Sequence, residues 1–162
     1  NVDKFWTDIP GISDLIREMG MTDQVIIKAA PKQEFLSLIR QYAPDMPFMP
    51  VVFSDNGLHD MLVKDRSIRY AGAEVIFSGE DSEFCRPEYI EKLHRDGCAI
   101  WVNPIIYDYH QQLTAGHTDD IAVSEDEDYG WGWLIDRGYD ILQTDFPLHL
   151  KTYIRQNYPA RA

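Results

Sequence analysis

The feature that most constrains the fold of this chain is a regular alternation of amphipathic helical segments with short apolar segments rich in β-branched and aromatic residues. A helical segment with Ile12, Leu15 and Ile16 on one face ends at Gly20, and glycine is a common C-terminal residue of helices. The apolar run 25–28 follows directly. Short runs of this kind, apolar on both faces, are typical of a parallel sheet covered by helices.

The same alternation continues to the end of the chain, with proline or glycine at most of the boundaries. Six such units in 162 residues average about 27 residues each, close to the ~30 of a βα unit. We therefore predict a single α/β domain over residues 1–162. The predicted strands are 1–6, 25–28, 48–53, 73–77, 98–103 and 140–145, and the predicted helices are 12–19, 31–43, 57–70, 87–96, 131–137 and a last helix from Pro147.

Two architectures fit this alternation: an open doubly wound sheet, or part of an eight-stranded (β/α) barrel. A full barrel usually needs ~250 residues, so this length suits about six of eight units. The opening segment 1–6 resembles the middle of a strand, which is the expectation for a chain that starts inside a barrel. In either architecture, ligand sites lie at the C-terminal ends of the strands. A nucleotide-binding sheet also needs a glycine-rich first turn, which the sequence lacks.

Charge and cysteine content narrow the possible functions. The 15 lysines and arginines against 27 aspartates and glutamates give a net charge of −12. Such an acidic chain argues against binding to nucleic acid or to anionic membranes, both of which require basic surfaces. No apolar run approaches the length of a membrane span. Cys85 and Cys98 are too few for a disulfide scaffold or a four-cysteine metal site.

Three segments together resemble the glycerophosphodiester phosphodiesterase family. In the run 131–147, a helix that ends at Gly138 leads into a strand ending Thr-Asp-aromatic-Pro, as in the closing unit of that family. Residues 100–103 resemble its Trp-x-x-Asn strand, and residues 1–4 resemble its strand with an acidic residue and a lysine. The similarity extends over nearly the whole chain in order and spacing.

The resemblance implies an incomplete (β/α)8 TIM-type barrel comprising about strands three to eight. The family's His-Arg-Gly, Glu-Asn-Thr, Glu-x-Asp and His-Asp motifs are missing from this sequence. No catalytic residue is therefore assigned here, and the catalytic histidines are expected upstream. The implied activity is metal-dependent hydrolysis of glycerophosphodiesters to glycerol 3-phosphate and an alcohol. The alternative is a non-catalytic barrel fragment or ligand-binding domain.

The resemblance also implies a small set of site residues. Asp3 is the predicted ligand of a divalent cation, Mg²⁺ or Ca²⁺, because hard cations prefer carboxylate oxygens. Lys4 is a predicted phosphate contact, although side chains alternate along a strand, so only one of this adjacent pair can face the site. Lys28 is predicted from its position at the end of an apolar run, not from the resemblance: it either holds a phosphate oxygen or extends from the end of its strand to solvent. Trp101 and Asn103 share a strand face and are predicted to line the substrate pocket, whereas packing of Trp101 in the core is the alternative.

Other polar features receive structural predictions. Residues 94–97 are expected to form the basic last turn of a helix. The acidic loop 114–128, which contains His117, is predicted to be a solvated, mobile lid. Asp145 is expected to cap the last helix. His59, His110 and His149 show no partner pattern.

The predicted partners follow from the family resemblance and from the incomplete barrel. The family resemblance implies a small phosphodiester as the substrate. An incomplete barrel exposes sheet edges, which predicts self-association or completion by an N-terminal barrel half.

Overall fold

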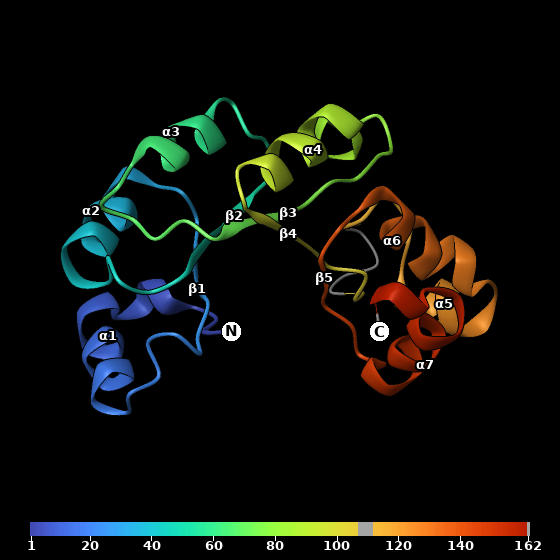
Figure 1. The fold of residues 1–162 in the computed structure, drawn as a ribbon, viewed down its shortest axis with the longest axis horizontal. Coiled ribbons are helices and arrows are strands. Elements are labelled where there is room, and N and C mark those ends of the chain that lie inside the picture. The colour runs from blue at the N-terminus through green and yellow to red at the C-terminus, as the bar shows by residue number, and fades with distance from the viewer. Residues whose placement is uncertain (107–111, 162) are drawn as a thin grey trace. The chain divides into compact units, whose positions relative to one another are not determined.

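The computed structural model of the chain describes residues 1–106 and 112–161, so His110 lies outside the described residues. Helices and parallel strands alternate along the chain, as Figure 1 shows, and the α/β prediction is confirmed. The sheet runs in chain order, β1-β2-β3-β4-β5. Its strands are β1 (Ile27–Ala29), β2 (Phe48–Val52), β3 (Gly72–Val75), β4 (Ala99–Val102) and β5 (Ile141–Leu142).

The helices lie where the periodicity predicts them, with one addition. A short helix, α5, forms inside the segment predicted to be a loop, and a π-helical turn, η3 (Asp128–Gly132), follows it. The helix predicted over 57–70 is shorter than expected because it ends before the loop that leads into β3. The helices are α1 (Ile9–Glu18), α2 (Gln33–Tyr42), α3 (Leu58–Lys64), α4 (Pro87–Arg95), α5 (Asp119–Ser124), α6 (Trp133–Arg137) and α7 (Pro147–Asn157).

The strand predicted over residues 1–6 is wrong. Only Val2 pairs with the sheet, through a single parallel bridge to Ile27. Lys4 then takes a left-handed conformation with φ of 54°, and the 3-10 helix η1 (Phe5–Thr7) begins. The turn is accompanied by the complete burial of Phe5 in the core, which stabilises this arrangement.

The chain divides into two compact units, and each has its own core. Unit 1 comprises Asn1–Glu74 and Lys92–Ala99, and unit 2 comprises Val75–Glu91 and Ile100–Ala162. In unit 1, the apolar faces of α1 and α2 pack with the strands around one cluster of buried side chains. Fully burying such a side chain contributes about 1.5–3 kcal/mol. The largest members are Phe5, Ile9, Ile27, Leu36, Ile39, Met46 and Phe48.

One cluster in the core of unit 2 is built around two aromatic side chains. Trp131 and Tyr153 are buried together, with ring centroids 6.0 Å apart, and Leu150 of α7 packs with them. This cluster brings η3 and α7 together, and Ala122 adds α5 to it. Within the described part of the chain, no helix is long and apolar enough to cross a membrane.

The carboxyl group of Asp65, at the C-terminal end of α3, gives unit 1 an acid-sensitive contact. Burial raises its pKa, but hydrogen bonds from Ser67 and Arg40 outweigh burial, and the net pKa is lowered. A lowered carboxyl pKa stabilises the folded state above the ordinary value of about 3.9, and this stabilisation is lost as the pH falls through the folded value.

Asp65→Asn is therefore expected to lower the free energy of unfolding at pH 7, with a deficit that shrinks toward pH 3. Urea unfolding at pH 7, 5 and 3 measures this. Asp14→Asn is the control, because the Asp14 side chain is 83% exposed. Equal deficits at every pH for Asp65→Asn would contradict this account.

Candidate functional site

Asp3 and Lys4 lie in the turn that follows the Val2 bridge, and both are exposed. Since they belong to a turn and not to a strand, strand alternation does not decide which one faces a site. Their roles as metal ligand and phosphate contact remain predictions.

Lys28 forms a buried ion pair in unit 1. Its Nζ lies 2.6 Å from Oε2 of Glu74, and the two side chains are 5% and 8% exposed. Lys28 stands in the middle of β1 and Glu74 in β3, with β2 between these strands in the sheet order. The predicted extension of Lys28 to solvent is therefore wrong, because its charge is neutralised inside the protein.

The sequence pattern did not single out Glu74 as a site residue. The signal available was one acidic residue inside an otherwise apolar strand, opposite in sign to the lysine at the end of another apolar run. A buried charge needs a partner, so two such interruptions of opposite charge are candidates for a pair. Which strands would bring them together could not be read from the sequence.

Trp101 and Asn103 lie together at the C-terminal end of β4, in unit 2. Both are buried, and the indole Nε1 of Trp101 donates a hydrogen bond of 3.2 Å to Oδ1 of Asn103. The shared face predicted from their spacing is consistent with this contact. Their role in lining a substrate pocket is still a prediction.

The prediction of a solvated lid over 114–128 is wrong for its first part. Thr114, His117 and Asp119 are all buried. Thr114 forms a parallel bridge with Phe77, so this segment runs beside the continuation of β3. The hydrophilic composition of this segment suggested a loop in solvent. Its buried polar side chains instead form their hydrogen bonds within unit 2.

Glu80 and His117 each lie three residues after one partner of the bridge between Phe77 and Thr114. The bridge therefore explains why their side chains are in contact. Nε2 of His117 lies 3.2 Å from Oε1 of Glu80. Nδ1 of His117 lies 2.7 Å from the carbonyl oxygen of Tyr129, and a carbonyl only accepts, so Nδ1 carries a proton and donates. The imidazole is thereby fixed at both nitrogens.

A stack of side chains from α6 completes this cluster. The rings of His117 and Trp133 stack with centroids 3.7 Å apart and planes inclined by 14°. The guanidinium carbon of Arg137 lies 3.3 Å from the centroid of the Trp133 ring. Nη2 of Arg137 is 3.8 Å from Oε2 of Glu80, so each carboxylate oxygen of Glu80 faces one nitrogen of a basic side chain.

Asp119, at the start of α5, joins three parts of unit 2. Its Oδ1 accepts a hydrogen bond of 2.7 Å from Nε1 of Trp131, and its Oδ2 accepts one of 2.8 Å from the backbone N–H of Asp145. The predicted capping role of Asp145 is wrong, since Phe146 precedes α7 and no side chain caps that helix. Asp145 contributes its backbone, and Asp119 supplies the carboxylate.

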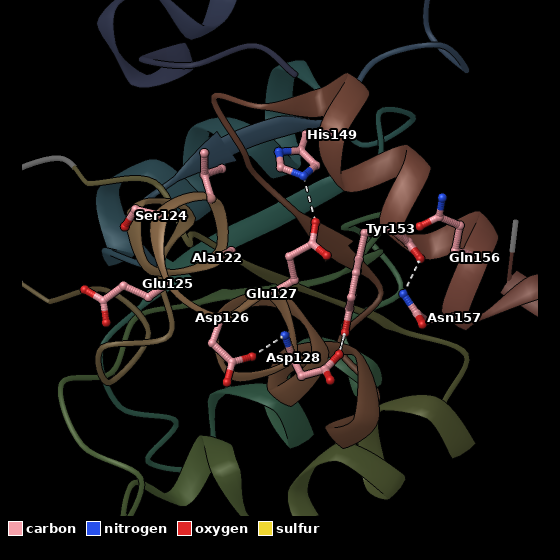
Figure 2. A pocket seen from close by; sticks show the side chains of 11 residues that line it. Ala122, Ser124, Glu125, Asp126, Glu127, Asp128, His149, Tyr153, Gln156 and Asn157 are labelled. Atoms are coloured by element: carbon pink, nitrogen blue, oxygen red, sulfur yellow. Dashed lines mark hydrogen bonds and ion pairs between the residues drawn. The ribbon is translucent and has the colours of Figure 1, made fainter.

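A polar cavity of about 640 Å³ lies between the α5–η3 segment and α7 (Figure 2). His149 forms an ion pair of 2.7 Å with Glu127, and the hydroxyl of Tyr153 donates a hydrogen bond of 2.5 Å to Asp128. Burial, with the carboxylate of Asp128, raises the pKa of Tyr153 above its ordinary range. The carboxylates on its wall make this cavity acidic, and several of them already have partners.

His59 also has partners that the sequence did not suggest. In unit 1, its Nε2 lies 2.9 Å from Asp96 and its Nδ1 lies 3.1 Å from the hydroxyl of Tyr70. Asp96 directly follows the basic last turn of α4, which is confirmed as a helix terminus. Burial, together with the charge of Asp96, raises the pKa of Cys98 to about 11, so this thiol is not an activated nucleophile.

The residues that the structure describes do not form a complete site for the divalent cation that the family resemblance implies. Across residues 1–106 and 112–161, no group of three or more histidine, cysteine, aspartate or glutamate side chains could hold a metal ion. Mg²⁺ and Ca²⁺ require several oxygen ligands, so Asp3 alone does not fit them. A complete site needs ligands from elsewhere, and no chemical step is assigned to the metal.

The structure is a parallel α/β fold with buried polar side chains in and after its strands. A family model, DUF4996, described as a domain of unknown function, matches residues 48–154, which is more than half of the chain. The chain belongs to this family. No curated protein matches it.

Proposed function

We propose that this chain is the C-terminal portion of a phosphodiesterase barrel that hydrolyses glycerophosphodiesters to glycerol 3-phosphate and an alcohol. The order of the strands supports the barrel. In a doubly wound sheet the strand order reverses at a switch point, whereas barrel strands follow one another in chain order. The five parallel strands described here keep chain order throughout.

The Lys28–Glu74 pair gives the barrel further support. The interior of a (β/α) barrel is filled in layers whose side chains come from alternate strands. Lys28 on β1 reaches Glu74 on β3 past the intervening β2. Contact between alternate strands is the arrangement that such a layer requires.

The observation that carries the proposed activity is the buried Trp101–Asn103 pair. These two residues stand at the segment that resembles the family's Trp-x-x-Asn strand, with one residue between them instead of two, and they lie at the C-terminal end of β4. Ligand sites of parallel α/β proteins lie at such ends. An indole surface beside a fixed amide suits the glycerol or alcohol part of a phosphodiester, because it combines an apolar wall with hydrogen-bonding groups.

A ligand-binding domain without catalytic activity is the second candidate, and one observation favours it. Lys28 already has a carboxylate partner, so its charge is not directly available to a phosphate. This candidate predicts that a glycerophosphodiester binds and is recovered unchanged.

The test compares this chain with the protein encoded by its whole open reading frame. The whole protein is expected to release glycerol 3-phosphate from glycerophosphocholine in the presence of Mg²⁺ or Ca²⁺, and chain 1–162 alone is expected to show no turnover. The reading frame upstream is expected to encode His-Arg-Gly and Glu-x-Asp motifs. Turnover by the isolated chain would contradict the upstream position of the catalytic histidines.

A further inference from the structure

Glu80 has an unusual setting for a surface carboxylate. Its side chain is about half exposed (51%), whereas the imidazole that holds it is completely buried. It follows β3 by a few residues and lies beyond the bridge between Phe77 and Thr114. This places Glu80 past the C-terminal end of a parallel strand, the side of such sheets on which ligands bind.

The groups behind Glu80 fix its orientation in two ways. His117 contacts one carboxylate oxygen and Arg137 approaches the other, at 3.2 and 3.8 Å. His117 is itself held by the carbonyl of Tyr129 and by the ring of Trp133. A side chain is pre-organised for binding when the residues that contact it are themselves held by packing and hydrogen bonds.

The chemistry of this carboxylate favours neutral hydrogen-bond donors as its ligands. An ionised carboxylate accepts about four hydrogen bonds, so contacts with His117 and Arg137 do not exhaust Glu80. The positive charge of Arg137 close by opposes the approach of a divalent cation. Hydroxyl groups carry no such penalty, and a charged acceptor binds them more strongly than a neutral one.

We propose that Glu80 binds hydroxyl groups of the substrate and that His117 is its positioning residue. This inference rests on the proposed function and adds to it a determinant of specificity: Glu80 selects the glycerol portion of a phosphodiester. A site built to bind a hydroxyl discriminates against an analogue that lacks it, since its polar group is then left without a partner.

The experiment measures kcat/KM of the whole protein for glycerophosphocholine and for 3-hydroxypropyl phosphocholine, which lacks the 2-hydroxyl group. The wild type is expected to prefer the glycerol compound by about tenfold or more. Glu80→Ala is expected to bring this ratio close to one, and Glu80→Gln, which keeps one acceptor oxygen, to leave an intermediate ratio. His117→Gln is expected to reduce the ratio because Glu80 loses its orientation.

Glu88→Gln is the matched control, because Glu88 is an exposed residue of α4 in the same unit. It is expected to keep the wild-type ratio. A ratio of two rates is insensitive to the fraction of folded enzyme, so it separates binding from a merely structural role. A wild-type ratio in Glu80→Ala would overturn this inference and leave the proposed function standing, whereas no hydrolysis of either compound by the wild type would overturn both.

Discussion

Replacing Glu74 by leucine is expected to lower the free energy of unfolding by about 3–5 kcal/mol, because the substitution leaves the ammonium group of Lys28 buried without its carboxylate partner. The loss exceeds that of an exposed ion pair, which contributes about 0–1 kcal/mol. Equilibrium unfolding in urea, followed by circular dichroism, measures the effect.

The double variant Lys28→Met, Glu74→Leu provides the decisive comparison. Both charges are then absent, so no desolvated group remains, and apolar side chains of similar size fill the space. Recovery of most of the lost stability is expected. Arg17→Met is a matched control, since the Arg17–Asp45 pair is much more exposed, and it should cost about 1 kcal/mol or less. A double variant as unstable as Glu74→Leu would show that the ion pair does not account for the loss.

Replacing Asp119 by alanine is expected to lower the free energy of unfolding by about 2–4 kcal/mol. The carboxylate accepts hydrogen bonds from the indole of Trp131 and from the backbone of Asp145. Its loss leaves two donors without their acceptor, and each buried unsatisfied group costs about 1–3 kcal/mol. Thermal or urea unfolding of the variant provides the measurement.

The neighbouring Asp120 supplies the control for this prediction. Asp120 is exposed and also lies in the first turn of α5, so Asp120→Ala removes the same charge near the helix N-terminus. Only a few tenths of a kcal/mol are expected from that change, in line with other surface charges at helix ends. Similar losses for the two variants would mean that helix electrostatics, and not the buried hydrogen bonds, explain the role of Asp119.

The periodicity of the sequence predicts the α/β alternation well, because amphipathic helices and short apolar strands leave different patterns. It fails at the N-terminus for a physical reason. The local sequence pattern around Phe5 suits a strand and a 3-10 turn equally well. Only the position of the core, in which Phe5 is buried, decides between the two conformations. Helix α5 was hidden because acidic residues in its first turn resemble those of a solvated loop.

The polar contacts were harder to predict than the elements. Lys28 was singled out because it stands at the end of an apolar run, and Trp101 because of the family resemblance. Glu74 and Glu80 were not, because their partners lie 46 and 37 residues away in the sequence and only the pairing of segments brings them together. Local sequence patterns indicate that a buried charge needs a partner, but not which distant segment supplies it.

The central claim is that this chain supplies part of a phosphodiesterase barrel, and hydrolysis of glycerophosphocholine by the protein from the whole open reading frame tests it most directly. The predicted result is release of glycerol 3-phosphate and choline in equal amounts with Mg²⁺ or Ca²⁺, and its loss on chelation. Recovery of glycerophosphocholine unchanged in the presence of either cation would contradict the claim.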